Sequence, residues 1–196
     1  MTELDTIPIA SYREQYGLKS FVETGCFRGD GIDAAKKAGF IDMHSCDINP
    51  DCISRCIEER FELDVALGHL RLACMESHLF IEKTMGILDA PTLFWLDAHL
   101  PLYYDLEEPN ELSRFPLYAE LEFIANSGRD ISSDVILCDD VRNITFNNPN
   151  AFRPDKDIAA EHCCDFIDYS KMRGVLSSTH TYDDQVIPNV GVYLPK

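Results

Sequence analysis

The sequence predicts an α/β sandwich, in which a largely parallel sheet carries helices on its faces and ends in an antiparallel hairpin. Short apolar runs typical of strands alternate with amphipathic segments typical of helices along most of the chain, as in parallel sheets. The last two strand-like runs, residues 175–182 and 186–194, instead follow each other across a turn at Asp183-Asp184. Because so short a connection joins antiparallel strands, we expect a hairpin at one sheet edge.

Helix boundaries follow from apolar periodicity and from start and stop residues. Ile32 and Ala35 lie on one side of a helix that Gly39 ends, and Pro50 opens the next helix, since proline is favoured in a first turn. The expected helices cover residues 8–16, 31–39, 50–61, 77–85, 117–126 and 158–172.

The strands are the short apolar runs between these helices. Residues 92–96 are apolar after Thr92, which suits a central parallel strand covered on both faces. Besides the final hairpin, the expected strands cover residues 20–23, 43–47, 70–74, 92–96 and 134–138.

Composition limits the function classes. A chain of 196 residues suits one domain, expected to span residues 1–196, and 45% hydrophobic residues argue against disorder. A net charge of −17 disfavours nucleic acid and anionic membranes as partners. With no bilayer-spanning run and no signal-peptide pattern, we expect a cytoplasmic protein, and the edge of the final hairpin offers a surface for a homodimer.

The eight cysteines predict no disulfide framework, because the chain is longer than small secreted domains and shows no export signal, and no zinc site, because spacing such as Cys-x-x-Cys is absent. Cys46, Cys74 and Cys138 lie in strand-like runs, so we expect them to be buried. Cys52 and Cys56 share one helix face and are expected to pack into the core.

A glycine-rich turn follows the first strand, with the pattern Gly25-x-x-x-Gly29-x-Gly31. Glycine lets the backbone approach a ligand, and the helix that follows offers free N–H groups. The pattern differs from the dinucleotide fingerprint Gly-x-Gly-x-x-Gly, so a plain strand-to-helix turn is the alternative interpretation.

Acids follow the second and third strands. Asp47 can accept two hydrogen bonds from a ribose diol, whereas the alternative is an Asp that caps the helix after Asn49-Pro50. Glu76-Ser77 follows the third strand, where these residues could contact an adenine, and here too the alternative is a helix cap.

Together, Glu23-x-Gly25-x-x-x-Gly29, the acid after the second strand and the acid-Ser pair after the third resemble class I S-adenosylmethionine-dependent methyltransferases. The resemblance covers nearly the whole chain and implies a Rossmann-like, mostly parallel seven-stranded sheet with an antiparallel C-terminal hairpin. It also implies S-adenosylmethionine as the cofactor, with its methionine part over residues 23–29. The cofactor-binding residues implied are Glu23, Thr24, Gly25, Cys26, Gly29, Asp47, Ile48, Glu76, Ser77 and Asp97.

Charge distinguishes this cofactor from a dinucleotide. A pyrophosphate needs positive charge, and Glu23 at the turn would repel it. A sulfonium with an ammonium group suits carboxylates, so S-adenosylmethionine is favoured over NAD, and an NAD-dependent enzyme stays as an alternative.

Three further carboxylates, Asp97, Asp139 and Asp140, follow the fourth and fifth strands. Like charges so close raise each other's pKa unless a cation joins them, and Mg²⁺ takes oxygen ligands. The three therefore predict a metal site. The alternatives are that Asp97 caps the next loop and that the Asp pair holds Arg142.

This second pattern resembles metal-dependent O-methyltransferases that act on sugar hydroxyls. Residues 94–99 and 136–142 are also similar to a little-characterised methyltransferase-like family. The resemblance implies His99 as the catalytic base beside Asp97, although a structural polar residue is the alternative for His99. Loops over residues 100–115 and 143–154 are expected to shape the pocket for a small-molecule acceptor, or else to contact a partner.

The expected reaction is methyl transfer to that acceptor, with a hydroxyl as the accepting group. Two other functions stay open. One is a non-catalytic protein that binds S-adenosylmethionine, and the other is a metal-dependent phosphoester hydrolase.

Overall fold

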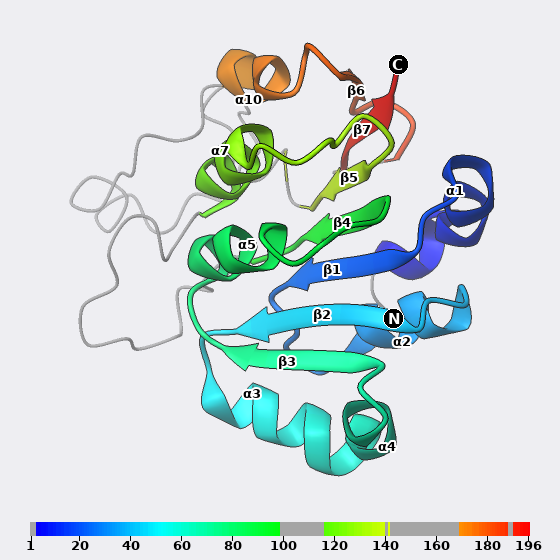
Figure 1. Cartoon of the computed structure of the whole chain (residues 1–196), viewed down its shortest axis with the longest axis vertical. Coiled ribbons are helices and arrows are strands. Elements are labelled where there is room, and N and C mark those ends of the chain that lie inside the picture. Colours follow the sequence, from blue (N-terminus) through cyan, green and yellow to red (C-terminus); the bar gives the residue numbers. More distant parts are fainter. Residues whose placement is uncertain (1–2, 99–115, 140, 142–168, 188–189) are drawn as a thin grey trace.

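The computed structural model describes residues 3–98, 116–139, 141, 169–187 and 190–196. Within them, one seven-stranded sheet has the order β3-β2-β1-β4-β5-β7-β6 (Figure 1). Strands β1 to β5 are parallel, and β7 is antiparallel to both β5 and β6, which confirms the predicted sheet and hairpin. The strands are β1 Ser20–Thr24, β2 Asp42–Asp47, β3 Leu70–Cys74, β4 Thr92–Leu96, β5 Val135–Cys138, β6 His180–Asp183 and β7 Gly191–Pro195.

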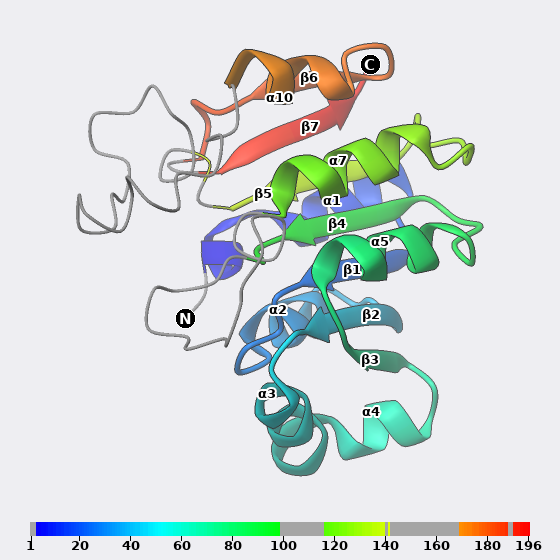
Figure 2. The ribbon, with the colours of Figure 1, turned by 90° about the vertical axis from the view of Figure 1, so that its left-hand side faces the viewer.

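Helices cover both faces of the sheet (Figures 1 and 2). One face carries η1 Glu3–Thr6, α1 Ile9–Tyr16, α2 Asp30–Lys37, α3 Pro50–Arg55, η2 Cys56–Phe61 and α4 Glu62–Ala66. The other carries α5 Ser77–Met85, α7 Leu117–Asn126 and α10 Tyr169–Val175. Each layer has its own apolar core, because each helix turns one stripe toward the sheet.

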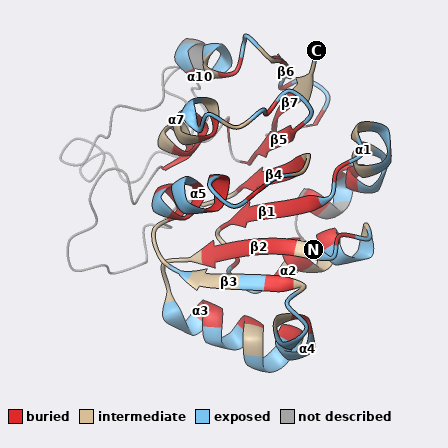
Figure 3. Cartoon of the chain, in the orientation of Figure 1, coloured by how far each residue is buried: buried red, intermediate tan, exposed pale blue. Residues whose placement is uncertain are grey.

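Burial follows this arrangement (Figure 3). Strands β1 and β4 lie in the middle of the sheet and are buried along their whole length, as predicted for residues 92–96. Cys46, Cys52, Cys56 and Cys138 are buried thiols, as predicted. The prediction is wrong at Cys74, which is exposed because β3 is an edge strand with a neighbour on one side alone.

Most predicted elements appear with the expected bounds or within two residues of them. The expected helix over residues 50–61 is divided, since regular α-helix ends at Arg55 and the wider turns of η2 lead into α4. Both expected strands of the final hairpin, over residues 175–182 and 186–194, are also wrong in their first halves, since β6 begins at His180 and β7 at Gly191. Val175 ends α10, and the turn that follows delays β6 until His180. Residues 158–168 of the predicted late helix lie outside the described residues.

In the part of the chain that the structure describes, no helix combines the length and apolar character needed to cross a bilayer.

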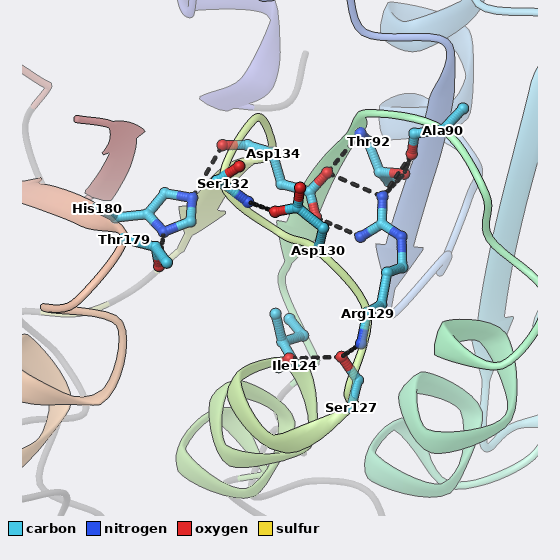
Figure 4. A network of polar contacts seen from close by, with 10 residues as sticks. All are labelled: Ala90, Thr92, Ile124, Ser127, Arg129, Asp130, Ser132, Asp134, Thr179 and His180. Atoms are coloured by element: carbon cyan, nitrogen blue, oxygen red, sulfur yellow. Dashed lines mark hydrogen bonds and ion pairs between the residues drawn. The ribbon is translucent and has the colours of Figure 1, made fainter.

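A buried ion pair links the beginnings of neighbouring strands (Figure 4). It lies at the end of the sheet opposite the strand ends where the site is predicted. The Asp134 side chain is 1% exposed and pairs with the guanidinium of Arg129, which is 11% exposed. Asp134 Oδ1 accepts hydrogen bonds from the Thr92 amide at 2.8 Å and from Arg129 at 3.0 Å. His180 Nε2 lies 3.0 Å from the Asp134 carbonyl oxygen. The cluster therefore joins the beginnings of β4, β5 and β6.

Replacement of Asp134 by Ala would leave the Arg129 charge without its carboxylate partner, with only the Ala90 carbonyl and the Thr92 hydroxyl as acceptors, and the Thr92 amide buried without its acceptor. We expect Asp134→Ala to lower the free energy of unfolding by about 3–5 kcal/mol in urea titrations. Asp130→Ala, at a neighbouring exposed acid, is the control and should cost much less. Equal losses in the two variants would show that the ion pair does not stabilise this end of the sheet.

Candidate cofactor and reaction site

The carboxyl ends of the parallel strands meet at one rim of the sheet, where backbone pairing continues one residue beyond the strands (Figure 1). The amides of Gly25, Asp97 and Asp139 donate to the carbonyl oxygens of Cys46, Thr24 and Leu96 over 2.9, 3.2 and 2.9 Å. With the strand register, these bonds place four residues in one row across neighbouring strands. We call them the rim row: Asp47, Gly25, Asp97 and Asp139.

Gly25 lies between two acids in the rim row. Because neighbouring strands lie about 4.8 Å apart, the backbones of Asp47 and Asp97 are separated by about 10 Å, and Gly25 between them carries no side chain. Gly25 has φ +83°, and a Cβ there would lie 2.9 Å from the Asp97 carbonyl oxygen. Glycine is therefore required both by the turn and by its contact with the β4 end.

Asp47 joins the end of β2 to the glycine-rich turn. Its Oδ2 accepts from the Phe27 amide and its Oδ1 from the Asn49 amide, both at 2.9 Å. The alternative that Asp47 caps α3 is wrong, because the side chain of Asn49 occupies that role and accepts from the Asp51 amide. A carboxylate offers about four lone-pair sites, so two backbone bonds leave capacity for a diol.

Glu23 lies beneath the turn rather than on the rim row. It is 2% exposed, accepts a hydrogen bond of 2.6 Å from Ser45 Oγ, and contacts the first turn of α2 at Gly31. Burial raises the pKa of Glu23 to about 8, and the bond from Ser45 opposes the rise in part. Its role in cofactor binding stays a prediction, but the carboxyl is mainly neutral at pH 7.

The other glycines of the turn make room for the protein's own side chains. A Cβ on Gly29 would lie 2.5 Å from the Phe61 ring, and one on Gly31 would lie 1.8 Å from Glu23 Oε1. Between them, Phe27 has φ +43°, a region that non-glycine residues rarely adopt. Strain of this kind is frequent at functional sites, and here the bond to Asp47 holds it.

The segment after β3 reaches the same rim. The Met75 amide donates to the Asp47 carbonyl oxygen at 3.0 Å, which places Glu76 and Ser77 beside the end of β2 and the half-buried Ile48. Glu76 occupies the N-cap position of α5, but its side chain makes no capping hydrogen bond. Glu76 is therefore the N-cap residue of α5, as the alternative interpretation states, but its carboxylate does not cap the helix.

Glu120 on α7 is a residue that the sequence reasoning missed. It is 0% exposed and approaches the rim from the opposite face of the sheet, near Thr24 and Ser77. Burial raises its pKa to about 7, which the two hydroxyls oppose in part, yet neither carboxyl oxygen makes a hydrogen bond of ordinary geometry. A signal was present, because Glu120 stands within the apolar stripe of Leu117, Leu121 and Ile124.

The predicted reaction site is described in part. Asp97 and Asp139 are neighbours in the rim row, and Trp95 Nε1 donates to Asp97 Oδ2 at 3.3 Å. Among the described residues, no group of three or more His, Cys, Asp or Glu side chains could hold a metal ion. Asp140, His99 and the loops over residues 100–115 and 143–154 lie outside the described residues. The metal site and the base therefore stay predictions.

Sequence comparison identifies no relative, since no model of a protein family matches the chain and no curated protein matches it significantly. Solved structures do resemble it.

The SAH-bound methyltransferase PaMTH1 of Podospora anserina is 16% identical with a TM-score of 0.63, over 96% of this chain and 76% of that chain. A putative caffeoyl-CoA O-methyltransferase from Staphylococcus aureus is 10% identical with a TM-score of 0.62, over 98% and 82%. An O-methyltransferase from Bacillus cereus in complex with SAH is 9% identical with a TM-score of 0.60, over 99% and 80%. The protein thus has the Rossmann-like fold of class I S-adenosylmethionine-dependent methyltransferases.

Proposed function

We propose that the protein is an S-adenosylmethionine-dependent methyltransferase that acts on a hydroxyl of a small-molecule acceptor. The observation that carries this proposal is the rim row, in which Asp47 and Asp97 stand on either side of the side-chain-free Gly25. Two acids around an open backbone suit a ligand with a ribose diol at one end and a cationic group at the other.

The chemical types of the rim residues, and their order along the rim, match the parts of this cofactor. Asp47 would accept the ribose hydroxyls, Glu76 and Ser77 would meet the adenine, and Asp97 would attract the ammonium group. The backbone of Gly25 and Cys26 would line the path between them. S-adenosylmethionine supplies an electrophilic methyl group when bound, and the chain would bind and orient it.

Protonation decides which acids supply the charge. Burial keeps Glu23 largely protonated and Glu120 about half protonated near neutral pH, since it raises their pKa values to about 8 and about 7. The half-buried Asp47 and Asp97 remain as the acids to attract a cation and to repel a pyrophosphate. The preference for S-adenosylmethionine over NAD therefore depends on these two residues.

At the reacting end, Asp97 and Asp139 offer two oxygen ligands on neighbouring strands, which suits Mg²⁺. A divalent cation supplies positive charge that lowers the pKa of a nearby hydroxyl. Asp140 would be the third ligand. His99 would accept the proton, because the pKa of free imidazole, near 6.5, suits a base at neutral pH.

The same pair of acids favours one competing function, a metal-dependent phosphoester hydrolase. Such an enzyme would release phosphate from a phosphomonoester with Mg²⁺ and no added cofactor, and S-adenosylhomocysteine would not bind. A non-catalytic protein would bind S-adenosylhomocysteine with the same dependence on Asp47 but would transfer no methyl group.

Asp47→Asn should weaken binding of S-adenosylhomocysteine about tenfold, because a neutral amide accepts weaker hydrogen bonds from a diol. Isothermal titration calorimetry measures the affinity, and thermal shifts with NAD provide the comparison. The control is Asp51→Asn, at an exposed acid of α3, which should bind like the wild type. Unchanged affinity in Asp47→Asn, or stabilisation by NAD alone, would contradict the proposed cofactor site.

His99→Ala should lower methyl transfer about 100-fold, as expected for loss of a general base, while affinity for S-adenosylhomocysteine is retained. Release of S-adenosylhomocysteine from S-adenosylmethionine is measured with a panel of catechols and sugars, with Mg²⁺ or with EDTA. Wild-type turnover should fall in EDTA. If His99→Ala turns over at the wild-type rate, another group removes the proton.

Glu23→Gln should reduce the dependence of stability on pH. The folded pKa of about 8 lies above the ordinary value of 4.5, so the folded state holds the extra proton and stability falls as pH rises through this window. Between pH 6.5 and 7.5, the wild type should lose about 1 kcal/mol through Glu23.

Urea titrations at these two pH values measure the difference. Histidine contributions are common to all variants, so a change of slope reports the glutamate. Glu122→Gln, at an exposed position of α7, should keep the wild-type slope. A Glu23→Gln variant with the same slope would mean that Glu23 is ionised in the folded protein.

A further inference from the structure

The underside of the glycine-rich turn contains two cysteines whose thiols face each other. Cys26 lies within the turn, and Cys56 begins η2 where α3 ends. Their Sγ atoms are 3.8 Å apart, and the residues are 3% and 0% exposed. The two sulfurs are 30 residues apart in the sequence, so the contact is made by the docking of the turn on the helix.

Cys56 contacts the turn at further points. Its sulfur lies 3.8 Å from the Phe27 carbonyl oxygen and would lie 3.2 Å from a Cβ on Gly29. On the other side, Cys26 Sγ lies 3.9 Å from Asp47 Oδ2, and the Cys26 amide donates to the Cys46 carbonyl oxygen at 2.8 Å. A change at the sulfur pair would therefore reach the turn and the rim row together.

We infer that Cys26 and Cys56 are a redox modification site, at which a peroxide converts the two thiols into a disulfide. The sulfurs need to approach by about 1.8 Å to reach disulfide bonding distance, which small rotations of both side chains and a shift of the turn can supply. Three other cysteines lie away from this pair, since Cys74 is exposed on edge strand β3 and Cys46 and Cys138 pack on the opposite face of the sheet.

The surroundings of the pair assign different roles to the two sulfurs. The hydrogen bond with Cys26 lowers the pKa of Cys56, and the positive charge of Arg60 adds to the effect. The same contact, with burial, raises the pKa of Cys26. Cys56 therefore ionises more readily and is the thiol that reacts first, and Cys26 is the thiol that follows.

The chemistry balances with hydrogen peroxide as the oxidant. The Cys56 thiolate attacks one peroxide oxygen, the O–O bond breaks, and hydroxide leaves and takes up a proton as water. Cys26 then attacks the sulfur of the resulting sulfenic acid, the S–O bond breaks, and the Cys26 proton leaves with the second water. The two thiols lose two electrons in total, which reduce one peroxide to two water molecules.

Disulfide formation would draw Cys26 toward η2 and away from Asp47. Since Asp47 and Gly25 belong to the rim row, the oxidised protein should bind the cofactor more weakly, an effect which rests on the proposed function. Binding and oxidation would oppose each other, so S-adenosylhomocysteine should slow disulfide formation.

The test treats the full chain with hydrogen peroxide, blocks residual thiols with iodoacetamide and maps peptides by mass spectrometry without reduction. A peptide pair that joins Cys26 to Cys56, and that dithiothreitol separates, is the expected result. The proposed modification site is overturned if Cys26 and Cys56 both carry the iodoacetamide label, or if either forms a disulfide with another cysteine.

The second measurement is the affinity for S-adenosylhomocysteine before oxidation, after oxidation and after dithiothreitol. We expect at least a tenfold loss that dithiothreitol reverses. Cys56→Ala should show the same affinity before and after peroxide, whereas the control Cys74→Ser should lose affinity on oxidation as the wild type does. A linked protein that binds as tightly as the reduced one overturns the effect on the cofactor. Absence of binding by the reduced protein overturns the proposed function instead, while the peptide map still decides the disulfide.

Discussion

The pairing of backbone groups just beyond the strand ends is the constraint on which the site depends. The amides of Gly25 and Asp97 continue the hydrogen-bond ladder past β1 and β4, and this places Asp47, Gly25 and Asp97 in one row. Because the ladder sets this order, the acids stand on either side of Gly25, which carries no side chain. The proposed cofactor site follows from this order.

The turn that contains Gly25 is held from below by side chains of the core. Glu23 packs under Gly31, Phe61 packs against Gly29, and Cys56 contacts Cys26. The same packing removes Glu23 from water and makes it mainly neutral. The half-buried acids Asp47 and Asp97 are therefore the residues proposed to supply the negative charge at the rim. Support of the turn and electrostatics of the rim are thus consequences of one packing arrangement, in which the thiol pair is the chemically reactive contact.

Much of the fold could be read from local patterns. The central strand over residues 92–96 was recognisable because both faces are buried and its sequence is therefore continuously apolar. The final hairpin was recognisable because no helix separates its strands. The acids Asp47, Asp97 and Asp139 could be assigned to one rim, since parallel strands end on the same side of a sheet. Glu23 was expected at the glycine-rich turn among the cofactor-binding residues, although its side chain is enclosed by Ser45 and α2.

The sequence by itself determined the order of elements, the parallel sheet and the position of the acids at the strand ends, because periodicity and turn residues act over short distances. Tertiary structure alone decided which carboxyls are buried, that Asn49 rather than Asp47 caps α3, that Glu120 reaches the rim, and that the sulfurs of Cys26 and Cys56 meet. The physical reason is that burial, pKa and contact between distant residues depend on how the helices dock on the sheet, which no local pattern records.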